Sequence, residues 1–475
     1  MKIRRGTVWG WMVLALILPL GFAGCGGKTG DQGTGEEGEE IDRAVSANNV
    51  LEVIELVDRN GDLTGTVRIT GFKGSGGSFV IPEEVNGKTI VEIGDEAFRG
   101  TSLSDVTIPG TVVYIGNYAF AGSLLATVTI SAGVKEIGDY AFVNTGLTTV
   151  TIPGSVEEIG SYAFAKVPEE TSEEEVEEAV AEGIEQAAAP GPALTKLTEL
   201  VLSEGIKTIG AGAFSKNALT TVSLPNSLTA LGNSAFESNE ISSLTISSGL
   251  RAINPSCFAN NKLSAVLIPE GVTTIGGDAF ADNSIASLRI PGSVRTIYSG
   301  AFKSNGAMTE VVFAEGLGYI DDSAFEGNSI AAIVFPESLQ GIGDAAFRGN
   351  KFTELVIPQR VTSIGSSAFY GNRLTKLNIA ARGTGIGNQA FAANKLDTIT
   401  ITAGNYITQG AFAENPLYDV VVEVKTQEGR KETVTTDLYK FGNDFFYWAY
   451  NTNSRRAGVY VFDGKYWVPQ GAETE

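Results

Sequence analysis

An alanine–phenylalanine pair recurs along most of this chain at a nearly constant interval. The phenylalanine returns every 22 residues, with single-residue slips near Phe325 and Phe412 and one larger gap between Phe164 and Phe214. The pair is Cys257-Phe258 in one unit. The series runs Phe98, Phe120, Phe142, Phe164, Phe214, Phe236, Phe258, Phe280, Phe302, Phe325, Phe347, Phe369, Phe391 and Phe412. A short fixed period predicts a solenoid that grows by stacking coils, so the 475 residues need not divide into several globular domains.

Each unit reads approximately L-x-x-V-x-I-P-x-x-V-x-x-I-G-x-x-A-F, as from Leu147 to Phe164. The L-x-x-V-x-I segment alternates apolar and other residues, which predicts a short strand with one buried face. A proline such as Pro153 follows the strand and ends its hydrogen-bond ladder, because proline has no N–H to donate. The later Val, Ile, Ala and Phe are expected to fill the interior on a return path made of a short turn or 3-10 segment.

Ten units also carry an asparagine just before the strand. The series is Asn217, Asn239, Asn261, Asn283, Asn305, Asn328, Asn350, Asn372, Asn394 and Asn415. An aligned column of amides can bond backbone groups of the neighbouring coil, which stacking would otherwise bury without partners. We therefore predict a structural role for these asparagines.

Composition excludes several classes of function. The chain has no histidine, so histidine-based catalytic triads and imidazole metal sites are impossible. A net charge of −21 argues against nucleic acid as a partner, since phosphate binding needs clustered Lys and Arg. We predict no catalytic residue, no metal and no cofactor.

The first 25 residues have the pattern of an export signal. Basic residues within positions 1–5 precede an apolar run from Trp9 to Leu20, which is too short to span a bilayer. The following Phe22-Ala23-Gly24-Cys25 resembles a bacterial lipoprotein cleavage box, with Phe22 where the box usually has leucine. The resemblance implies lipidation of Cys25, an exported protein and a membrane anchor. The alternative is ordinary cleavage, which leaves a secreted protein with a free thiol.

Two segments separate this signal from the repeats. Residues 26–47, rich in Gly and Glu, are predicted to form a flexible acidic tether. Residues 48–90 are predicted to form an N-terminal hairpin and cap, with its turn at Asn60-Gly61. Asp58 to Asp62 also has some of the spacing of a calcium loop, but position twelve of that loop would be Ile69, so a turn is the better interpretation.

The solenoid is expected over residues 91–424, with one acidic insertion at 168–195. Nine glutamates and no basic residue lie between Val167 and Thr195. Val176, Val180 and Ile184 recur at helical spacing, which predicts a solvated helix. A docking arm for a basic partner and a calcium-chelating loop are the alternatives.

The outward strand positions form two columns, which we expect to run across a continuous sheet. One is Asp105, Thr127, Thr149, Glu199, Thr221, Ser243, Ala265, Ser287, Glu310, Ala332, Glu354, Lys376 and Thr398. The other is Thr107, Thr129, Thr151, Val201, Ser223, Thr245, Leu267, Arg289, Val312, Val334, Val356, Asn378 and Thr400. Early coils present hydroxyls, whereas later coils present apolar side chains.

A candidate binding face follows from these columns: Leu267, Arg289, Val312, Val334 and Val356 with Glu310 and Glu354 beside them. An exposed apolar patch favours a partner, although β-branched residues also occur on strands for their propensity alone. The two glutamates, roughly 9 to 10 Å apart across two strands, also allow a glycosidase hypothesis. We reject it because an open strand surface gives no pocket for a catalytic acid.

After about residue 424 the period is lost and the chain becomes rich in aromatic residues. Residues 425–475 are predicted to form a small α+β cap, with a helix over 437–449 and a hairpin through Asp463-Gly464. Trp448 and Trp467 are expected to belong to its core. A carbohydrate-binding aromatic platform built on these two tryptophans is the alternative.

The period, the Ala-Phe pair and the I-P-x-x-V-x-x-I-G core together resemble the BspA-like leucine-rich repeats, which include treponemal surface lipoproteins. Gly65 to Phe72 resembles the lead-in hairpin of that family, and the resemblance covers about residues 62–424. It implies a leucine-rich-repeat solenoid that acts as a surface adhesin for a host matrix or cell-surface protein, or for another bacterial surface component. It supplies no shared binding motif. A passive envelope spacer or assembly module and a polysaccharide-binding protein remain alternatives.

Overall fold

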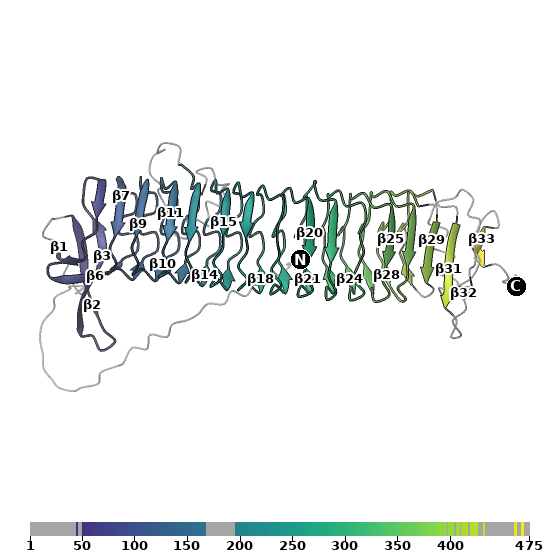
Figure 1. Cartoon of the computed structure of the whole chain (residues 1–475), viewed down its shortest axis with the longest axis horizontal. Coiled ribbons are helices and arrows are strands. Elements are labelled where there is room, and N and C mark those ends of the chain that lie inside the picture. Colours follow the sequence, from purple (N-terminus) through teal and green to yellow (C-terminus); the bar gives the residue numbers. More distant parts are fainter. Residues whose placement is uncertain are drawn as a thin grey trace, which may run out of the picture. The chain divides into compact units, whose positions relative to one another are not determined.

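The computed structural model describes residues 44–45, 50–167, 195–396, 398–402, 405–408, 410–416, 419–425, 431–432, 460–462 and 467–469. For 44–45, 398 and the residues after 416 it describes the backbone alone. The chain divides after Asp42, and every described residue belongs to the unit that begins at Arg43. That unit is a parallel β-solenoid with a period of about 22 residues, as the sequence predicts (Figure 1).

Most coils contribute one longer strand to a first ladder, and the outward side of these strands is called the front face. Their alternation of buried and exposed residues confirms the predicted pattern, for example in Thr149–Ile152. The strands are β4 Gly77–Val80, β7 Leu103–Ile108, β9 Thr127–Ile130, β11 Thr149–Ile152, β13 Glu199–Leu202, β15 Thr221–Ser223, β17 Ser243–Thr245, β20 Ser287–Ile290, β22 Glu310–Phe313, β25 Glu354–Ile357, β27 Lys376–Ile379, β29 Thr398–Thr402 and β31 Asp419–Lys425.

The return path forms a second parallel ladder of short strands, which sequence reasoning did not predict. Its outward side is called the back face. The strands are β6 Lys88–Ile93, β8 Tyr114–Ile115, β10 Glu136–Ile137, β12 Glu158–Ile159, β14 Thr208–Ile209, β16 Ala230–Leu231, β18 Ala252–Ile253, β19 Thr274–Ile275, β21 Thr296–Ile297, β23 Tyr319–Ile320, β24 Gly341–Ile342, β26 Ser363–Ile364, β28 Gly385–Ile386 and β30 Tyr406–Ile407. Two residues are too few to show an alternating pattern, so the sequence gives no sign of these strands. They form because the neighbouring coil brings its backbone within hydrogen-bonding reach.

The glycine that follows most of these short strands is required by close packing of the coils. A Cβ atom on Gly365 would lie 2.4 Å from the backbone nitrogen of Asp344 in the preceding coil. A non-glycine residue fits there only if its coil shifts.

An antiparallel hairpin precedes the first coil. β2 Leu51–Val57 pairs with β3 Leu63–Phe72 around the predicted turn at Asn60-Gly61, and β1 Ala44–Val45 pairs with β2. β3 then pairs in parallel with β6, and β5 Glu84–Val85 pairs with β6 from the side. The hairpin thereby covers the first edge of the second ladder, where open backbone groups would otherwise invite pairing with another chain.

The recurring phenylalanines form a continuous stack through the interior. Their rings are nearly parallel with centroids 4.9 to 5.8 Å apart, from Phe98–Phe120 to Phe236–Phe258. Ten of them rank among the largest side chains that are fully buried. Offset stacking of aromatic rings adds to the burial of their large apolar surface.

The asparagines have the predicted structural role. The Asn261 amide donates to the backbone oxygens of Phe236 in the preceding coil and Phe258 in its own coil, at 3.0 and 3.2 Å. Its Oδ1 accepts the backbone N–H of Ile241 at 3.0 Å. The same contacts to the preceding coil recur at nearly every asparagine of the series, so each side chain replaces water for backbone groups that stacking has buried.

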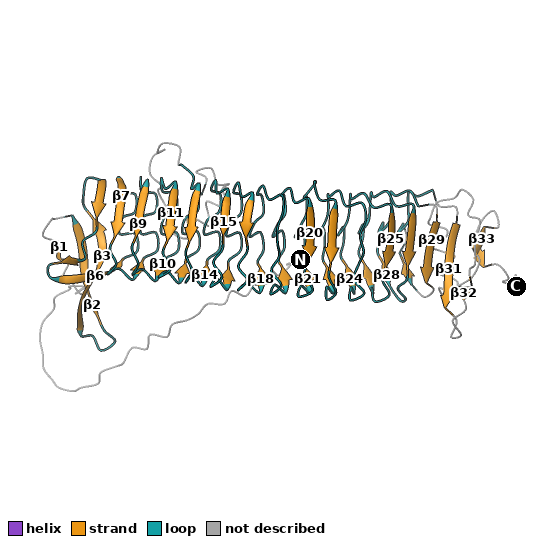
Figure 2. Ribbon diagram, in the orientation of Figure 1, coloured by secondary structure: helices purple, strands orange, loops and turns teal. Residues whose placement is uncertain are grey.

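The front sheet is not continuous, which corrects the expectation from the sequence. Its strands pair in short groups, and residues 263–268 and 330–335 form no strand (Figure 2). Around the second gap, Phe313 and Phe335 take the last inward position, where most coils have Ile, and Phe335 contacts Phe347 and Phe369 edge-on. The second ladder continues through the same coils, where β23, β24 and β26 remain paired.

The second ladder is interrupted once, between β16 and β18. The Phe236 and Phe258 rings of these two coils are 5.8 Å apart, the widest spacing in the stack. The first gap in the front sheet, at residues 263–268, lies in the next coil. Each interruption is confined to one face of the solenoid, because β15 still pairs with β17 beside the first break and β18 still pairs with β19 beside the second.

The described residues contain no helix (Figure 2), so there is no helix among them that is long and apolar enough to cross a membrane. The predicted helices at 168–195 and 437–449 lie outside the described residues, apart from Thr195. At the C-terminal end β31 pairs with β32 Lys431–Glu432. β33 Tyr460–Phe462 pairs antiparallel with β34 Trp467–Pro469, while the expected turn at Asp463-Gly464 lies outside the described residues.

Candidate functional site

From residue 267 onward, one column of the front face carries four large apolar side chains. Leu267, Val312, Val334 and Val356 are 78%, 43%, 84% and 57% exposed. Each lies one residue before the last inward residue of its coil, so alternation of the backbone turns it to solvent. We call these four residues with Arg289 the apolar column.

The stacking of coils brings the five residues into neighbouring positions. Arg289 is the parallel partner of Val312. The coil of Val334 is bonded to those of Val312 and Val356, because the Ser329 N–H donates to the Met308 oxygen at 3.0 Å and the Lys351 N–H to the Ile330 oxygen at 2.9 Å. The 22-residue offset also links the coils of Leu267 and Arg289, because the Ala286 N–H donates to the Ser264 oxygen at 3.1 Å. Arginine beside apolar residues is a frequent composition at the centre of protein–protein interfaces.

The two predicted glutamates lie on the same face in the adjoining column. Glu354 forms an ion pair with Lys376 at 3.1 Å, and Glu310 is the parallel partner of Ser287. Both carboxylates are exposed, and the coil of Val334 lies between theirs. The arrangement offers charge for binding on an open surface, without the enclosed acid and base that glycoside hydrolysis needs.

The early coils present the polar part of the front face. Thr127, Thr129, Thr149 and Thr151 are exposed. The Asp105 carboxylate accepts hydrogen bonds from the hydroxyls of Thr127 and Ser104, and these bonds lower the pKa of Asp105. The change from hydroxyls to the apolar column therefore divides the face along its length.

Three predicted site residues cannot be placed. Cys25 and Trp448 lie outside the described residues, and for Trp467 the structure describes only the backbone, within β34. The other cysteine, Cys257, is buried and its thiol donates to the Gly232 oxygen at 3.2 Å. Burial raises the pKa of Cys257 to about 12, so the residue is an inert filler in the alanine position, as predicted.

The Asp58 turn is explained without a metal. The Asp58 carboxylate accepts the backbone N–H groups of Asn60 and Asp62 at 2.8 and 3.0 Å, which lowers the pKa of Asp58. Across the described ranges, His, Cys, Asp and Glu nowhere gather in a group of three that could hold a metal ion.

Sequence reasoning missed one buried charge. Lys166 is 8% exposed and its ammonium donates to the Thr145 backbone oxygen. Burial lowers the pKa of Lys166 to about 8, since a charged amine is poorly solvated in the interior. The residue lies at the border of the acidic insertion, at a point where the repeat pattern is already lost.

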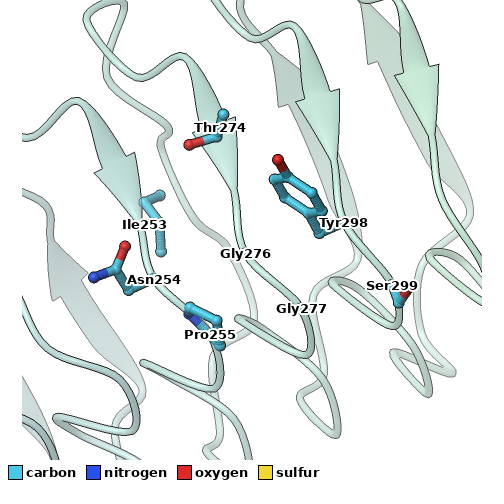
Figure 3. A pocket seen from close by; sticks show the side chains of 8 residues that line it. All are labelled: Ile253, Asn254, Pro255, Thr274, Gly276, Gly277, Tyr298 and Ser299. Carbon is cyan, nitrogen blue, oxygen red and sulfur yellow. The ribbon is translucent and has the colours of Figure 1, made fainter. Parts of the chain in front are cut away.

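It also missed a hollow on the back face, between Pro255 and Tyr298 (Figure 3). The signal was present in the sequence, because Asn254 and Tyr298 occupy the glycine position that follows the short strand. The sequence alone does not show that these two positions face each other across a hollow, because that depends on how the coils stack.

Comparisons with known proteins agree with this architecture. The model for the BspA type leucine-rich repeat region matches residues 84–174, 193–309 and 296–418, about two thirds of the chain. No curated protein matches. Because the match spans more than half of the chain, it establishes the family.

Solved structures with similar coils come from several bacteria. The pneumococcal vaccine antigen PcpA is 21% identical, with 77% of this chain and 88% of that one covered and a TM-score of 0.46. A leucine-rich repeat protein of Bacteroides ovatus is 17% identical, with 74% and 93% covered and a TM-score of 0.43. The leucine-rich repeat protein of T. pallidum is 20% identical, with 58% and 86% covered and a TM-score of 0.25. The repeat model, together with the stacked coils themselves, shows that this chain belongs to the BspA type leucine-rich repeat family.

Proposed function

We propose that this chain is an exported, lipid-anchored surface protein whose front face binds a protein of a host matrix, a host cell or another bacterium. The observation that carries the proposal is the apolar column. Repeat solenoids generally use such aligned outward positions as extended binding surfaces. The chemistry is recognition without catalysis.

The apolar column is large enough to contribute substantially to binding. Burying a Val or Leu side chain completely stabilises by about 1.5 to 3 kcal/mol, and these four begin 43% to 84% exposed. Together they would contribute on the order of 4 to 8 kcal/mol before the losses of association are subtracted. The Arg289, Glu310 and Glu354 charges on the same face would then select the partner by charge complementarity.

A binding panel tests the proposal. Residues 26–475 are offered to immobilised matrix proteins, glycans and bacterial surface fractions, and saturable binding to at least one protein is expected. The double variant Leu267→Lys and Val334→Lys should abolish it, because each lysine places a hydrated charge inside the interface. Both positions are exposed, so circular dichroism should show an unchanged fold.

The matched control places the same charges elsewhere on the face. Thr127→Lys with Thr149→Lys adds two lysines to exposed positions of the hydroxyl coils and should preserve binding. Equal losses in both double variants would point to net charge and contradict the role of the apolar column. No saturable binding to any protein would favour the passive spacer.

Lipid anchoring is tested separately. Labelled palmitate should be incorporated into the full chain expressed in a bacterium with lipoprotein processing, and the label should vanish in Cys25→Ala. Cys257→Ala is the matched control, since alanine is the usual residue at that buried position. Label that persists in Cys25→Ala would exclude Cys25 as the acceptor.

A further inference from the structure

The back face has an open hollow of about 360 Å³ that spans three successive coils (Figure 3). Its floor is the diglycine Gly276-Gly277, with Thr274 before it. Asn254-Pro255 of the preceding coil forms one wall and Tyr298-Ser299 of the following coil forms the other. Its volume is at the lower end of the range for small-molecule sites.

Three departures from the repeat pattern create this hollow, at Asn254-Pro255, Gly277 and Tyr298. Most coils have glycine after the short strand, and its N–H bonds the preceding coil, as Gly232 does to the Ile209 oxygen at 2.7 Å. In the coil of Cys257 the side chain of Asn254 replaces that backbone donor and reaches the Leu231 oxygen at 2.8 Å. The second ladder is interrupted at this coil, and Pro255 follows as a rigid wall.

The opposite wall is an exposed tyrosine in a glycine position. The Tyr298 N–H keeps the ladder bond to the Ile275 oxygen at 2.9 Å, so the coil remains in register. Its side chain is 44% exposed and stands beside the diglycine, which has no side chain to cover the ring. The aromatic ring is thereby left available to a ligand.

The lining is uncharged. Besides the Tyr298 ring and Pro255 it offers the hydroxyls of Thr274, Tyr298 and Ser299. No side-chain hydrogen bond within the described residues uses these three hydroxyls. A charged ligand would find no counter-ion here, whereas a ligand with a flat apolar face and a hydroxyl-bearing edge matches both parts of the lining.

We propose that the hollow is a subsite for one neutral pyranose ring of a glycan. The ring would stack on Tyr298, and its hydroxyls would exchange hydrogen bonds with Thr274 and Ser299. The two walls lie two coils apart. The ring centroids of these coils are 5.5 Å apart for Phe258–Phe280 and 5.3 Å apart for Phe280–Phe302. That is roughly 11 Å, which admits one ring with contact distances of about 3.5 to 4 Å on either side. Proline-rich peptides favour grooves lined by several aromatic residues, and this hollow has one.

The test is saturation-transfer difference NMR on residues 26–475 with methyl glycosides of glucose, galactose, mannose and N-acetylglucosamine at millimolar concentration. We expect saturation of the ring protons of at least one glycoside. Tyr298→Gly should weaken its affinity by roughly tenfold or more, through loss of the stacking surface. Gly277→Asn should fill the floor and do the same.

Both variants restore residues that other coils have at these positions, so the fold should persist. Tyr319→Ala is the matched control: this tyrosine lies in the same ladder, is 50% exposed and does not line the hollow, and its variant should bind like the original chain. Absence of any glycoside signal would overturn the proposal. So would unchanged affinity in Tyr298→Gly, or binding of a proline-rich peptide alone in a parallel titration.

Discussion

Phe280→Ala should lower the free energy of unfolding by about 4 kcal/mol, within the range typical of buried Phe→Ala changes. Phe280 is fully buried and its ring stacks on Phe258 and Phe302 at 5.5 and 5.3 Å. The change removes the ring from the middle of the phenylalanine stack and leaves a cavity bounded by two coils. Because each coil contacts only its neighbours, the loss falls on both interfaces at once.

Urea denaturation followed by circular dichroism measures the effect. A long solenoid can unfold in more than one step, so hydrogen exchange of amides in residues 263–302 should accompany the equilibrium curve. Val334→Ala, at an 84% exposed position, is the control and should change stability by at most about 0.5 kcal/mol. If Phe280→Ala changed stability no more than this control, the stack would not be the main source of stability.

Asn305→Ala should destabilise the chain by about 3 kcal/mol, although it removes no apolar surface. The Asn305 amide donates to the backbone oxygens of Phe280 and Phe302 at 2.9 and 3.2 Å. Its Oδ1 accepts the Ile285 N–H at 3.1 Å, and the side chain is fully buried. Alanine leaves the Ile285 N–H without a partner in the interior, at about 1 to 3 kcal/mol, and removes one of the two amide donors from each oxygen, since Asn283 still donates to Phe280 and Asn328 to Phe302.

Two further substitutions separate hydrogen bonding from volume. Asn305→Thr should be intermediate, because Thr145 at the equivalent position of an earlier coil still donates to the Phe142 oxygen at 3.0 Å. Asn233→Ala changes an exposed asparagine of the back face and should have little effect. Thermal and urea unfolding of the three variants give the ranking. Equal stability of Asn305→Ala and the original chain would show that water replaces the amide.

The two faces are expected to respond independently to mutation. The apolar column belongs to the front face, and the hollow beside Tyr298 belongs to the back face. Lysines at Leu267 and Val334 should therefore leave glycoside binding intact, and Tyr298→Gly should leave protein binding intact. Failure of one proposal would leave the other standing.

The amino-acid sequence by itself determined the period, the Phe stack, the inward and outward columns and the role of the asparagines. These features depend on the alternation within a strand and on each coil meeting a similar neighbour, so they can be read from the repeat pattern alone. Exposure of Leu267 and Val334 follows from the same alternation. The burial of Cys257 follows from its place in the Ala-Phe series.

Only the tertiary structure decided where the ladders form and where they break. The second ladder has two-residue strands with no pattern of their own, and it forms because stacked coils bring their backbones within reach. Where the front strands are missing, the second ladder continues between the same coils, as β18 with β19 and β23 with β24, so no single unit shows where a break will fall. The hollow also arises from stacking: Asn254, Gly277 and Tyr298 come from three successive coils, and stacking turns three local exceptions into one concave surface.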